Sequence, residues 1–306
     1  MPSPLFSAVI PVYNRAGLIR TTLDSVFAQN RPELDVVVVD DGSTDATVSV
    51  LRSYGDRITL VQQDNSGPGA ARNAGIAAAQ GEYIAFLDSD DLWFPWTLAV
   101  YETIIRQHDS PSFLAGNPFL FRKEEDLADV PRQAPTTTAF PDYLASGDKW
   151  RWWGASSFVV RRTALQDAGG FTNKWVNAED ADLTLRLGTA PGFVDVHGAP
   201  TFAYREHDGT AMDVSENTLK GAFHLVESER DGRYPGGPSR QRERRRILSR
   251  HLRPTMLDSL AAGRHAEAWH LYRATLPWHT QLGRWKFLVG FLMRDLQSRL
   301  LAPSTS

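Results

Sequence analysis

Strand and helix signals alternate regularly through the first hundred residues of this chain of 306. Runs of apolar, largely β-branched residues predict buried strands, and the segments between them carry apolar residues at helical spacing. Units that alternate in this way predict an α/β fold. Its doubly wound, mostly parallel sheet is flanked by helices and binds ligands at the carboxyl ends of its strands. The predicted strands are FSAVIPV, LDVVVVD, ITLVQQ and YIAFLD, and the predicted helices cover residues 16–29, 43–55 and 70–80.

Weaker signals continue the pattern after the fourth strand. They predict a helix at 95–108 and a strand at 113–121. Residues 122–150 are polar and rich in Pro and Thr, which predicts a long loop. Short strands and one compact amphipathic helix, AEDADLTLRLG, follow up to about residue 207.

The remainder of the chain predicts a second, helical part. We therefore expect an α/β domain at 1–212 and a helical C-terminal extension at 213–306. An apolar stripe on the last helix predicts packing against the rest of the protein or in a homodimer. The alternative is a peripheral membrane contact, with the Arg-dense segment RQRERRRILSRHLR upstream as support. The stripe consists of Trp285, Leu288, Leu292 and Leu296.

Composition narrows the class of protein. The net charge of −3 and the pI of about 6.2 predict no nucleic-acid partner. The lack of cysteine excludes disulfides, thiolate metal sites and thiol nucleophiles, and it suits a reducing compartment. The N-terminus has no basic region typical of a signal peptide, and WKFLVGFLM is far shorter than the ~20 residues of a membrane span. We expect a cytoplasmic protein, either free or peripheral at the inner face of the membrane.

Three carboxylates follow the fourth predicted strand in YIAFLDSDDLW. Asp88, Asp90 and Asp91 would raise one another's pKa unless a cation were nearby. Mg²⁺ and Mn²⁺ take oxygen ligands, and Asp88 and Asp90 face the same side of an extended segment. This Asp-x-Asp motif therefore indicates a site for Mn²⁺ or Mg²⁺. A solvated turn is the alternative, and for an isolated Asp-x-Asp it is the commoner one.

Two further motifs lie at the predicted ligand edge of the sheet. Asp40 and Asp41 end the second strand, where an Asp can accept hydrogen bonds from a nucleobase or a ribose. An Asx-type turn would explain one of the two. The loop NSGPGAARNAG feeds a helix N-terminus, which suits an anionic ligand, and Arg72 in it could contact a base or phosphate. A tight turn with a solvent-facing Arg72 is an equal alternative.

Candidates for proton transfer and for metal binding come from the second half. Glu179 and Asp180 open the helix AEDADLTLRLG, and a carboxylate at the sheet rim could take the proton of an incoming hydroxyl. Acidic residues in a first turn also complement the helix dipole, which is the alternative. His207 could add an imidazole ligand for Mn²⁺, although a lone His is more often structural.

Taken together and in order, these motifs resemble those of a family 2 glycosyltransferase of the GT-A fold. The motifs are SAVIPVYNRAGLIRTTLDSVFAQ, VVVDDGSTDAT, NSGPGAARNAGIAAAQGEYIAFLDSDDLW, GASSFVVRR…GGF and AEDADLTLRLG, over roughly residues 5–210. The resemblance implies an inverting hexosyltransferase-like enzyme of glycan, glycoconjugate or polysaccharide biosynthesis. It would move a sugar from a nucleotide-diphosphate donor, a UDP-sugar by resemblance, to a hydroxyl of a glycan, lipid-linked or other acceptor.

The resemblance also implies roles for individual residues. The nucleotide-sugar half would cover about 1–92 and the acceptor half about 93–212. Asp90 would bind the metal that bridges the diphosphate, Asp180 would deprotonate the acceptor, and Glu179 would tune that base or bind acceptor. Asp91 would serve the turn or the helix cap beyond it. The implied donor-binding residues are Pro11, Tyr13 (stacked on the base), Asp41 with Asp40 in support, Arg72, and Asp88 on the ribose side.

One departure and one competing function accompany the resemblance. QLGRW spells the Gln-x-x-Arg-Trp motif of the processive members, but it lies far from the core and without a spanning segment, so a single-addition enzyme is predicted. The competing function is a catalytically silent sugar-nucleotide binding or scaffold protein with the same fold. A nucleotidyltransferase would need a Gly-rich, Arg-containing N-terminal signature, which IPVYNRAG does not supply.

Overall fold

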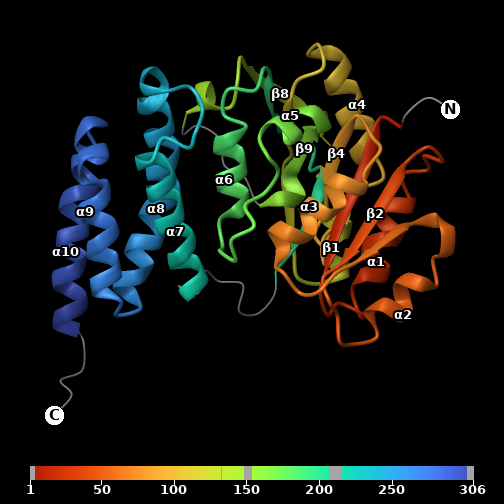
Figure 1. The fold of residues 1–306 in the computed structure, drawn as a ribbon, viewed down its shortest axis with the longest axis horizontal. Coiled ribbons are helices and arrows are strands. Elements are labelled where there is room, and N and C mark those ends of the chain that lie inside the picture. Colours follow the sequence, from red (N-terminus) through yellow and green to blue (C-terminus); the bar gives the residue numbers. More distant parts are fainter. Residues whose placement is uncertain (1–3, 132, 148–153, 207–214, 302–306) are drawn as a thin grey trace. The chain divides into compact units, whose positions relative to one another are not determined.

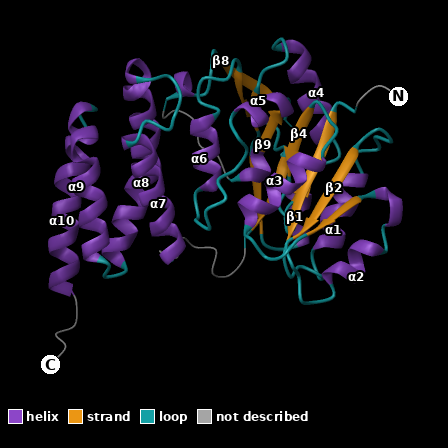
Figure 2. Ribbon diagram, in the orientation of Figure 1, coloured by secondary structure: helices purple, strands orange, loops and turns teal. Residues whose placement is uncertain are grey.

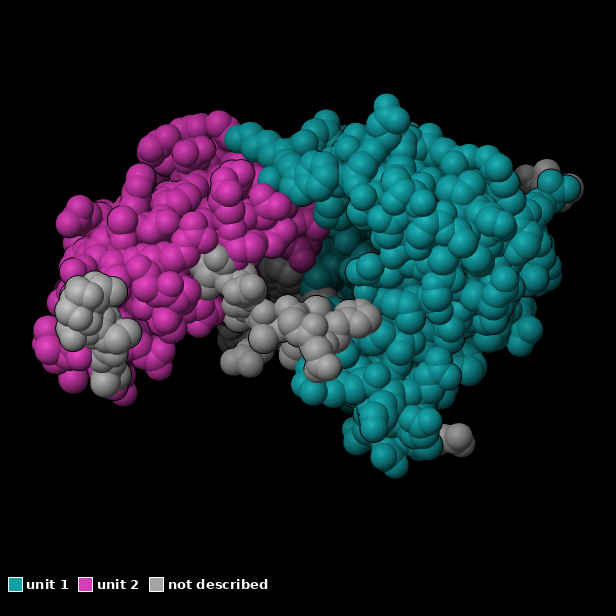
Figure 3. All heavy atoms as spheres, turned by 90° about the horizontal axis from the view of Figure 1, so that it is seen from below, with its two compact units in different colours: residues 1–146, 150–175, 189–207 teal, residues 147–149, 176–188, 208–306 magenta. Residues whose placement is uncertain are grey.

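The structure is a computed structural model that describes residues 4–131, 133–147, 154–206 and 215–301. The chain divides into two compact units, which Figure 3 colours separately. The segment 176–188 groups with the helices of the second unit, although it precedes the domain boundary predicted at residue 212. That boundary stays a prediction. Unit 1 comprises residues 1–146, 150–175 and 189–207, and unit 2 comprises residues 147–149, 176–188 and 208–306.

Unit 1 is built on a mixed, mostly parallel sheet (Figure 2). Within the described residues it has eight strands in the order β3-β2-β1-β4-β9-β6-β10-β8. The first four are parallel, β9 runs antiparallel to both β4 and β6, and β8 runs antiparallel to β10. The strands are β1 (Phe6–Val12), β2 (Asp35–Asp40), β3 (Thr59–Gln62), β4 (Tyr83–Phe86), β6 (Phe113–Ala115), β8 (Thr136–Phe140), β9 (Phe158–Arg161) and β10 (Phe193–His197).

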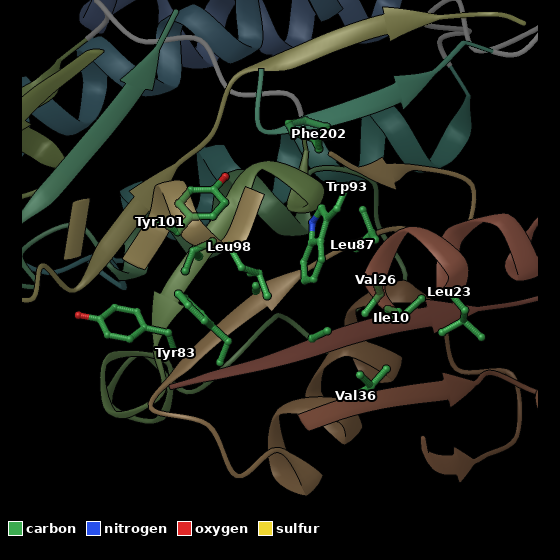
Figure 4. Close-up of a cluster of buried hydrophobic side chains, with 14 of the residues drawn as sticks. Ile10, Leu23, Val26, Val36, Tyr83, Leu87, Trp93, Leu98, Tyr101 and Phe202 are labelled. Atoms are coloured by element: carbon green, nitrogen blue, oxygen red, sulfur yellow. The ribbon is translucent and has the colours of Figure 1, made fainter. Parts of the chain in front are cut away.

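Helices cover both faces of this sheet, as the continuous apolar strands predict (Figure 1). Side chains alternate along β1, so Ile10 packs in one buried cluster with Leu23 of α1 and Leu98 of α4 (Figure 4). Val9 points to the opposite face and meets α3. The helices of unit 1 are α1 (Ile19–Phe27), α2 (Thr47–Arg52), α3 (Pro68–Ala78), α4 (Thr97–Gln107) and α5 (Arg162–Asp167).

Gly75 sets the distance between α3 and the sheet. A Cβ at this position would overlap Cγ1 of Val9 on β1 and would lie 3.3 Å from Cγ2 of Val39 on β2. Since both valines are fully buried strand residues, neither side chain has room to withdraw. The absence of a side chain at Gly75 therefore lets α3 lie directly against β1 and β2.

Two sequence predictions in the middle of the chain are wrong. The single strand expected at 113–121 is two strands, β6 in the large sheet and β7 in a small sheet of order β5-β11-β7. The loop expected at 122–150 contains a 3₁₀ turn at Glu124–Asp129 and strand β8, because its Thr-rich segment pairs with β10. The strands of the small sheet are β5 (Leu92–Trp93), β7 (Pro118–Phe121) and β11 (Phe202–Arg205).

Unit 2 is helical in all its described elements. Tight turns after α8 and α9 form Schellman caps around Gly263 and Gly283, whose φ angles are 74° and 66°. In these caps Arg264 N donates to Ser259 O at 2.8 Å and Arg284 N donates to His279 O at 2.9 Å. No described helix combines the length and the apolar character that a membrane crossing requires. The helices are α6 (Glu179–Arg186), α7 (Glu216–Arg230), α8 (Gln241–Ala261), α9 (His265–Gln281) and α10 (Trp285–Leu301).

The packing of α3 gives a stability prediction with a matched control. Gly75→Ala should lower the free energy of unfolding by about 1–3 kcal/mol, because the new methyl group is forced against Val9. Gly290→Ala in α10 has open space around the new Cβ and should gain about 0.5–1 kcal/mol from helix propensity. Urea denaturation of both variants measures the two changes, and a stabilised Gly75→Ala would contradict the close packing.

Candidate active site

A pocket of about 370 Å³ lies where β1, β2 and β4 end, at the carboxyl edge of the parallel part of the sheet. The site predicted from sequence is largely gathered here, and every residue that lines the pocket belongs to unit 1. The pocket is open to solvent and polar on the β4 side. The predicted residues that line it are Pro11, Tyr13, Asp41, Arg72, Asp88 and Asp90.

Asp41 holds the loop between β3 and α3 through its buried carboxylate. Its Oδ1 accepts hydrogen bonds from Gln63 Nε2 at 2.7 Å and from the backbone N–H of Ser66 at 2.9 Å. Its Oδ2 accepts a third from the N–H of Gly67 at 2.9 Å. The side chain is 4% exposed, so these donors replace the water that an ionised carboxylate requires. Asp41 therefore forms one wall of the pocket and also fixes the loop that forms the next.

Asp40 lies on the other side of the strand end. Its Oδ1 accepts a hydrogen bond from the N–H of Ser43 at 3.3 Å, and it lines a separate hollow with Gly42 and Gln62. Gly42 is required in this turn, since its φ is 77° and a Cβ would lie 2.8 Å from the backbone nitrogen of Asn65. The turn-forming role foreseen for one of the two aspartates thus falls to Asp40, outside the pocket.

Arg72 is buried and faces the pocket, so the alternative of a solvent-facing side chain is wrong. Its Nη2 lies 2.7 Å from Oδ1 of Asp88, and the guanidinium lies 5.3 Å from the ring centroid of Phe171. The side chain is only 6% exposed, against 32% for Asp88. This ion pair links the first turns of α3 to the end of β4 and leaves part of Asp88 open to the pocket.

The structure divides the three carboxylates of the Asp-x-Asp-Asp segment. Asp88 and Asp90 line the pocket, and Arg15 Nε lies 3.7 Å from Oδ2 of Asp90. Asp91 points inward, where it accepts hydrogen bonds from Ser156 Oγ at 2.6 Å and from the N–H of Arg205 at 3.0 Å. Burial and the negative charges of Asp88 and Asp90 raise the pKa of Asp91 well above its ordinary value.

Of the two roles predicted for Asp91, the helix cap is wrong, whereas its N–H donates to Asp88 O at 3.1 Å and closes the turn. Asp91 caps no helix, because α4 begins after Trp96 and has no side-chain cap. It joins the segment that follows β4 to Ser156 before β9 and to β11. Tyr204, also on β11, shows the same negative field: burial and the charges of Asp91, Asp88 and Asp90 raise its pKa to about 12. A solvated turn does not account for a segment held in this way.

The residues at the pocket fit a hard divalent cation. Asp88 and Asp90 supply carboxylate oxygens. Mg²⁺ in proteins is usually bound by one or two carboxylates together with the phosphates of a substrate. In the part of the chain that the structure describes, no three His, Asp or Glu side chains gather as a complete metal site. His207, the other predicted ligand, lies outside the described residues.

Sequence reasoning gave no role to several residues that line the pocket, Trp175 and Arg15 among them. Trp175 is 53% exposed, and its ring lies 3.4 Å from where a Cβ on Gly67 would be. Asn73 of α3 holds the Trp175 loop, since its Oδ1 accepts a hydrogen bond from Phe171 N at 2.7 Å and its Nδ2 donates to Phe171 O at 2.9 Å. Arg15 was missed as well, and no local pattern distinguishes either from surface residues.

Tyr13 and Arg15 lie on a loop that is fixed by the next βα loop. The N–H of Asn14 donates to Ser43 Oγ at 2.9 Å, and the N–H of Thr44 donates to Asn14 Oδ1 at 2.8 Å. Asn14 adopts φ 51°, a left-handed conformation that Asn tolerates better than most residues. Tyr13 is 44% exposed beside buried Pro11, so its ring is available to a planar ligand.

Glu179 and Asp180, the predicted proton-transfer pair, open α6 in unit 2. Ala178 before them has φ 90°, a strained conformation for a residue with a Cβ. The first turns of α7 hold this corner: Asn177 N donates to Asn217 O at 3.1 Å, and any side chain at Gly221 would overlap Asn177 O. Strain that is held by close packing in this way is typical of functional sites.

Asp182 anchors α6 from within the same first turn. Its Oδ1 accepts a hydrogen bond from Tyr234 Oη at 3.0 Å and lies 3.2 Å from His224 Nε2, and its Oδ2 lies 2.8 Å from Arg186 Nη2. Burial acts to raise the pKa of Asp182, but the contacts to His224, Arg186 and Tyr234 outweigh it and leave the pKa lowered. The buried, ionised Asp182 thus fixes the first turn of α6, which also carries Asp180, to α7.

Solved structures share this fold. The S. aureus protein TarS (residues 1–349, in complex with UDP-GlcNAc) superposes with a TM-score of 0.66 at 19% identity, over 96% of this chain and 88% of that one. A mannosyltransferase from Pyrobaculum calidifontis, in complex with GDP-Man and Mn²⁺, gives a TM-score of 0.51 at 22% identity, over 96% and 87%. The fold is the GT-A fold that these proteins share.

A family model matches the first part of the chain. Residues 7–136 match the family model described as Glycosyl transferase family 2. This part of the chain is therefore similar to a family 2 glycosyltransferase domain.

Curated relatives are also named glycosyltransferases, but each match covers only part of the two chains. An uncharacterized glycosyltransferase of Rickettsia typhi is 45% identical over 93 residues, 30% of this chain and 29% of that protein. An uncharacterized glycosyltransferase of Nostoc sp. is 31% identical over 166 residues, 52% of each chain. A putative teichuronic acid biosynthesis glycosyltransferase of Bacillus subtilis is 45% identical over 94 residues, 29% of this chain and 37% of that protein. The matches thus span about half or less of these relatives.

The role of Asp41 in the pocket wall can be tested through stability. Asp41→Asn should lower the free energy of unfolding by about 1–3 kcal/mol, because an amide N–H at this buried position would face one of the three N–H donors that now share the carboxylate oxygens. Asp64→Asn, in the same loop but exposed, should change it by less than about 0.5 kcal/mol. Equal effects of the two substitutions in urea denaturation would show that Asp41 does not hold the loop.

Proposed function

We propose that this protein is an inverting glycosyltransferase. It would move a sugar from a nucleotide-diphosphate donor, a UDP-sugar, to an acceptor hydroxyl in glycan or polysaccharide biosynthesis. The observation that carries the proposal is the pocket that gathers Asp41, Arg72, Asp88 and Asp90 at the carboxyl ends of adjacent parallel strands. Ligands of doubly wound sheets bind at this edge.

The pocket supplies contacts suited to each part of such a donor. Tyr13 offers an exposed ring for stacking on the base, beside Pro11, and Asp41 offers a carboxylate edge to the base imide. Asp88 is proposed on the ribose side, with Arg72 near the nucleotide. The bound UDP, UDP-GlcNAc and GDP-Man in the structures of similar fold support a nucleotide-sugar donor.

Asp90 is proposed as the metal ligand, for Mn²⁺ or Mg²⁺, with His207 as a further candidate. A bound divalent cation would neutralise the charge that develops on the leaving diphosphate. Arg15, which lies beside Asp90, would add positive charge at the same point of the pocket. The Mn²⁺ in the mannosyltransferase of similar fold supports a divalent ion.

Asp180 is proposed as the general base, and Glu179 as the residue that tunes it or binds acceptor. The carboxylate takes the acceptor hydroxyl proton as the new bond forms between the acceptor oxygen and the anomeric carbon. The bond from that carbon to the diphosphate breaks on the opposite face, which inverts the configuration. The corner at Ala178 and the anchor at Asp182 hold α6 for this task. A cytoplasmic setting remains part of the proposal.

Donor turnover tests the function directly. Incubation with a panel of UDP- and GDP-sugars should release nucleoside diphosphate from at least one donor with Mn²⁺ or Mg²⁺, and EDTA should abolish the release. Asp90→Asn should weaken metal-dependent donor binding by about tenfold or more, since it removes a charged ligand. Release from no donor, together with no nucleotide-induced rise in melting temperature, would refute the proposal.

The base is tested by separating binding from transfer. Asp180→Asn should reduce transfer by at least about a hundredfold while leaving the dissociation constant for nucleotide nearly unchanged, because the residues of the pocket are untouched. Glu179→Gln is the matched control on the same turn and should retain more activity than Asp180→Asn. Substantial transfer by Asp180→Asn would assign the base elsewhere.

A further inference from the structure

Helix α10 exposes a continuous apolar face. Six large apolar side chains recur at helical spacing on its outer side, and the most exposed, Leu300 and Met293, are 76% and 67% accessible. Isolated exposed apolar residues are ordinary, but a contiguous stripe along one helix indicates an interaction surface. We call this set the α10 face, and it consists of Trp285, Val289, Leu292, Met293, Leu296 and Leu300.

The opposite side of α10 accounts for its packing on the other helices. Phe291 is fully buried and stacks on Tyr272 of α9 with ring centroids 4.3 Å apart, and Leu288 is buried beside it. The single apolar stripe expected from sequence is therefore wrong. Leu288 belongs to the core, whereas Trp285, Leu292 and Leu296 lie outside it, so packing within the unit does not explain the α10 face.

Charge identifies the partner. Lys286 lies one helical turn from Val289 at one edge of the α10 face, and Arg299 lies one turn from Leu296 at the other. The only acidic residue of α10, Asp295, is 8% exposed and contacts both His265 at 2.7 Å and Arg299 at 3.0 Å. Lys286 is therefore the edge cation without a carboxylate of α10 beside it, while the Arg299 side chain remains 55% exposed. An apolar stripe with cationic edges is the pattern of a helix that lies in an anionic membrane surface.

The net charge of the whole helical segment also favours an anionic partner. Residues 216–301 carry sixteen Lys and Arg against eight Asp and Glu, a net charge of +8 in a chain whose total is −3. A second copy docked α10 against α10 would bring like charges together, since the one acidic side chain of α10, Asp295, is already paired with Arg299 and His265 of its own chain. The described helices are also too short or too polar to cross a bilayer. A membrane contact of α10 would therefore place the helix on the bilayer surface.

We infer that the α10 face docks the protein on a lipid bilayer that carries anionic headgroups. The apolar side chains enter the interfacial region, and Lys286 and Arg299 remain at the level of the headgroups. This inference rests on α10 and on the net charge of residues 216–301, and it is independent of the proposed transferase activity.

Vesicle co-sedimentation of the full chain tests the inference. The protein should bind vesicles of phosphatidylcholine with about 40% phosphatidylglycerol and bind pure phosphatidylcholine at least about tenfold more weakly, with the difference reduced by salt. Leu292→Ser with Leu296→Ser should lower partitioning to anionic vesicles by about tenfold or more. Lys286→Glu should lower it less, and Leu276→Ser, an exposed apolar residue of α9, should not change it.

The competing results are distinct. Since the substituted side chains are exposed, circular dichroism and the melting temperature should match those of the wild type. Failure to bind anionic vesicles at low salt, or binding that the Leu292/Leu296 double substitution leaves unchanged, would overturn the inference. A lipid-free dimer in sedimentation equilibrium that this double substitution dissociates would assign the α10 face to a second copy instead.

Discussion

The close packing of α3 against β1 and β2 is the constraint on which the pocket depends. Gly75 allows this approach, and Arg72 lies one turn before it on the same helix. At this distance the Arg72 side chain, buried against Phe171, reaches the carboxylate of Asp88 at the end of β4. A helix held further from the sheet would lose that ion pair and with it the wall between the β3–α3 loop and the Asp-x-Asp segment.

Four carboxylates then share one edge of the sheet, and each is stabilised differently. Asp41 is satisfied by three N–H donors, Asp88 by Arg72, and Asp90 has Arg15 nearby. Asp91 is withdrawn from solvent, with a raised pKa. The negative charge that remains accessible is thus limited to Asp88 and Asp90. Electrostatically, this is a site that a cation and a diphosphate can occupy together.

The first four strands, and the pocket at their ends, could be predicted because the relevant signals are local. Buried β-branched runs such as the one in β2 fix strand identity, and the acidic residues follow them directly in sequence. Strand β8 could not be predicted, because its pairing with β10 joins segments more than fifty residues apart. Trp175 was missed for the same reason, since only the fold brings it to Gly67. Asp91 resembles its neighbours in sequence, and burial alone separates it from them.

The helical unit is more than an appendage to the domain that resembles the family. Its α7 braces the strained corner at Ala178 through Asn177 and Gly221, and its buried Asp182–His224 contact fixes the helix that Asp180 opens. Unit 2 therefore provides both the support for the proposed base and the α10 face. If a lipid surface orients α10 and the acceptor is lipid-linked, the unit that holds Asp180 through α6 and α7 also brings the protein to its acceptor through α10. A soluble acceptor would give the cationic edges of α10 no such role.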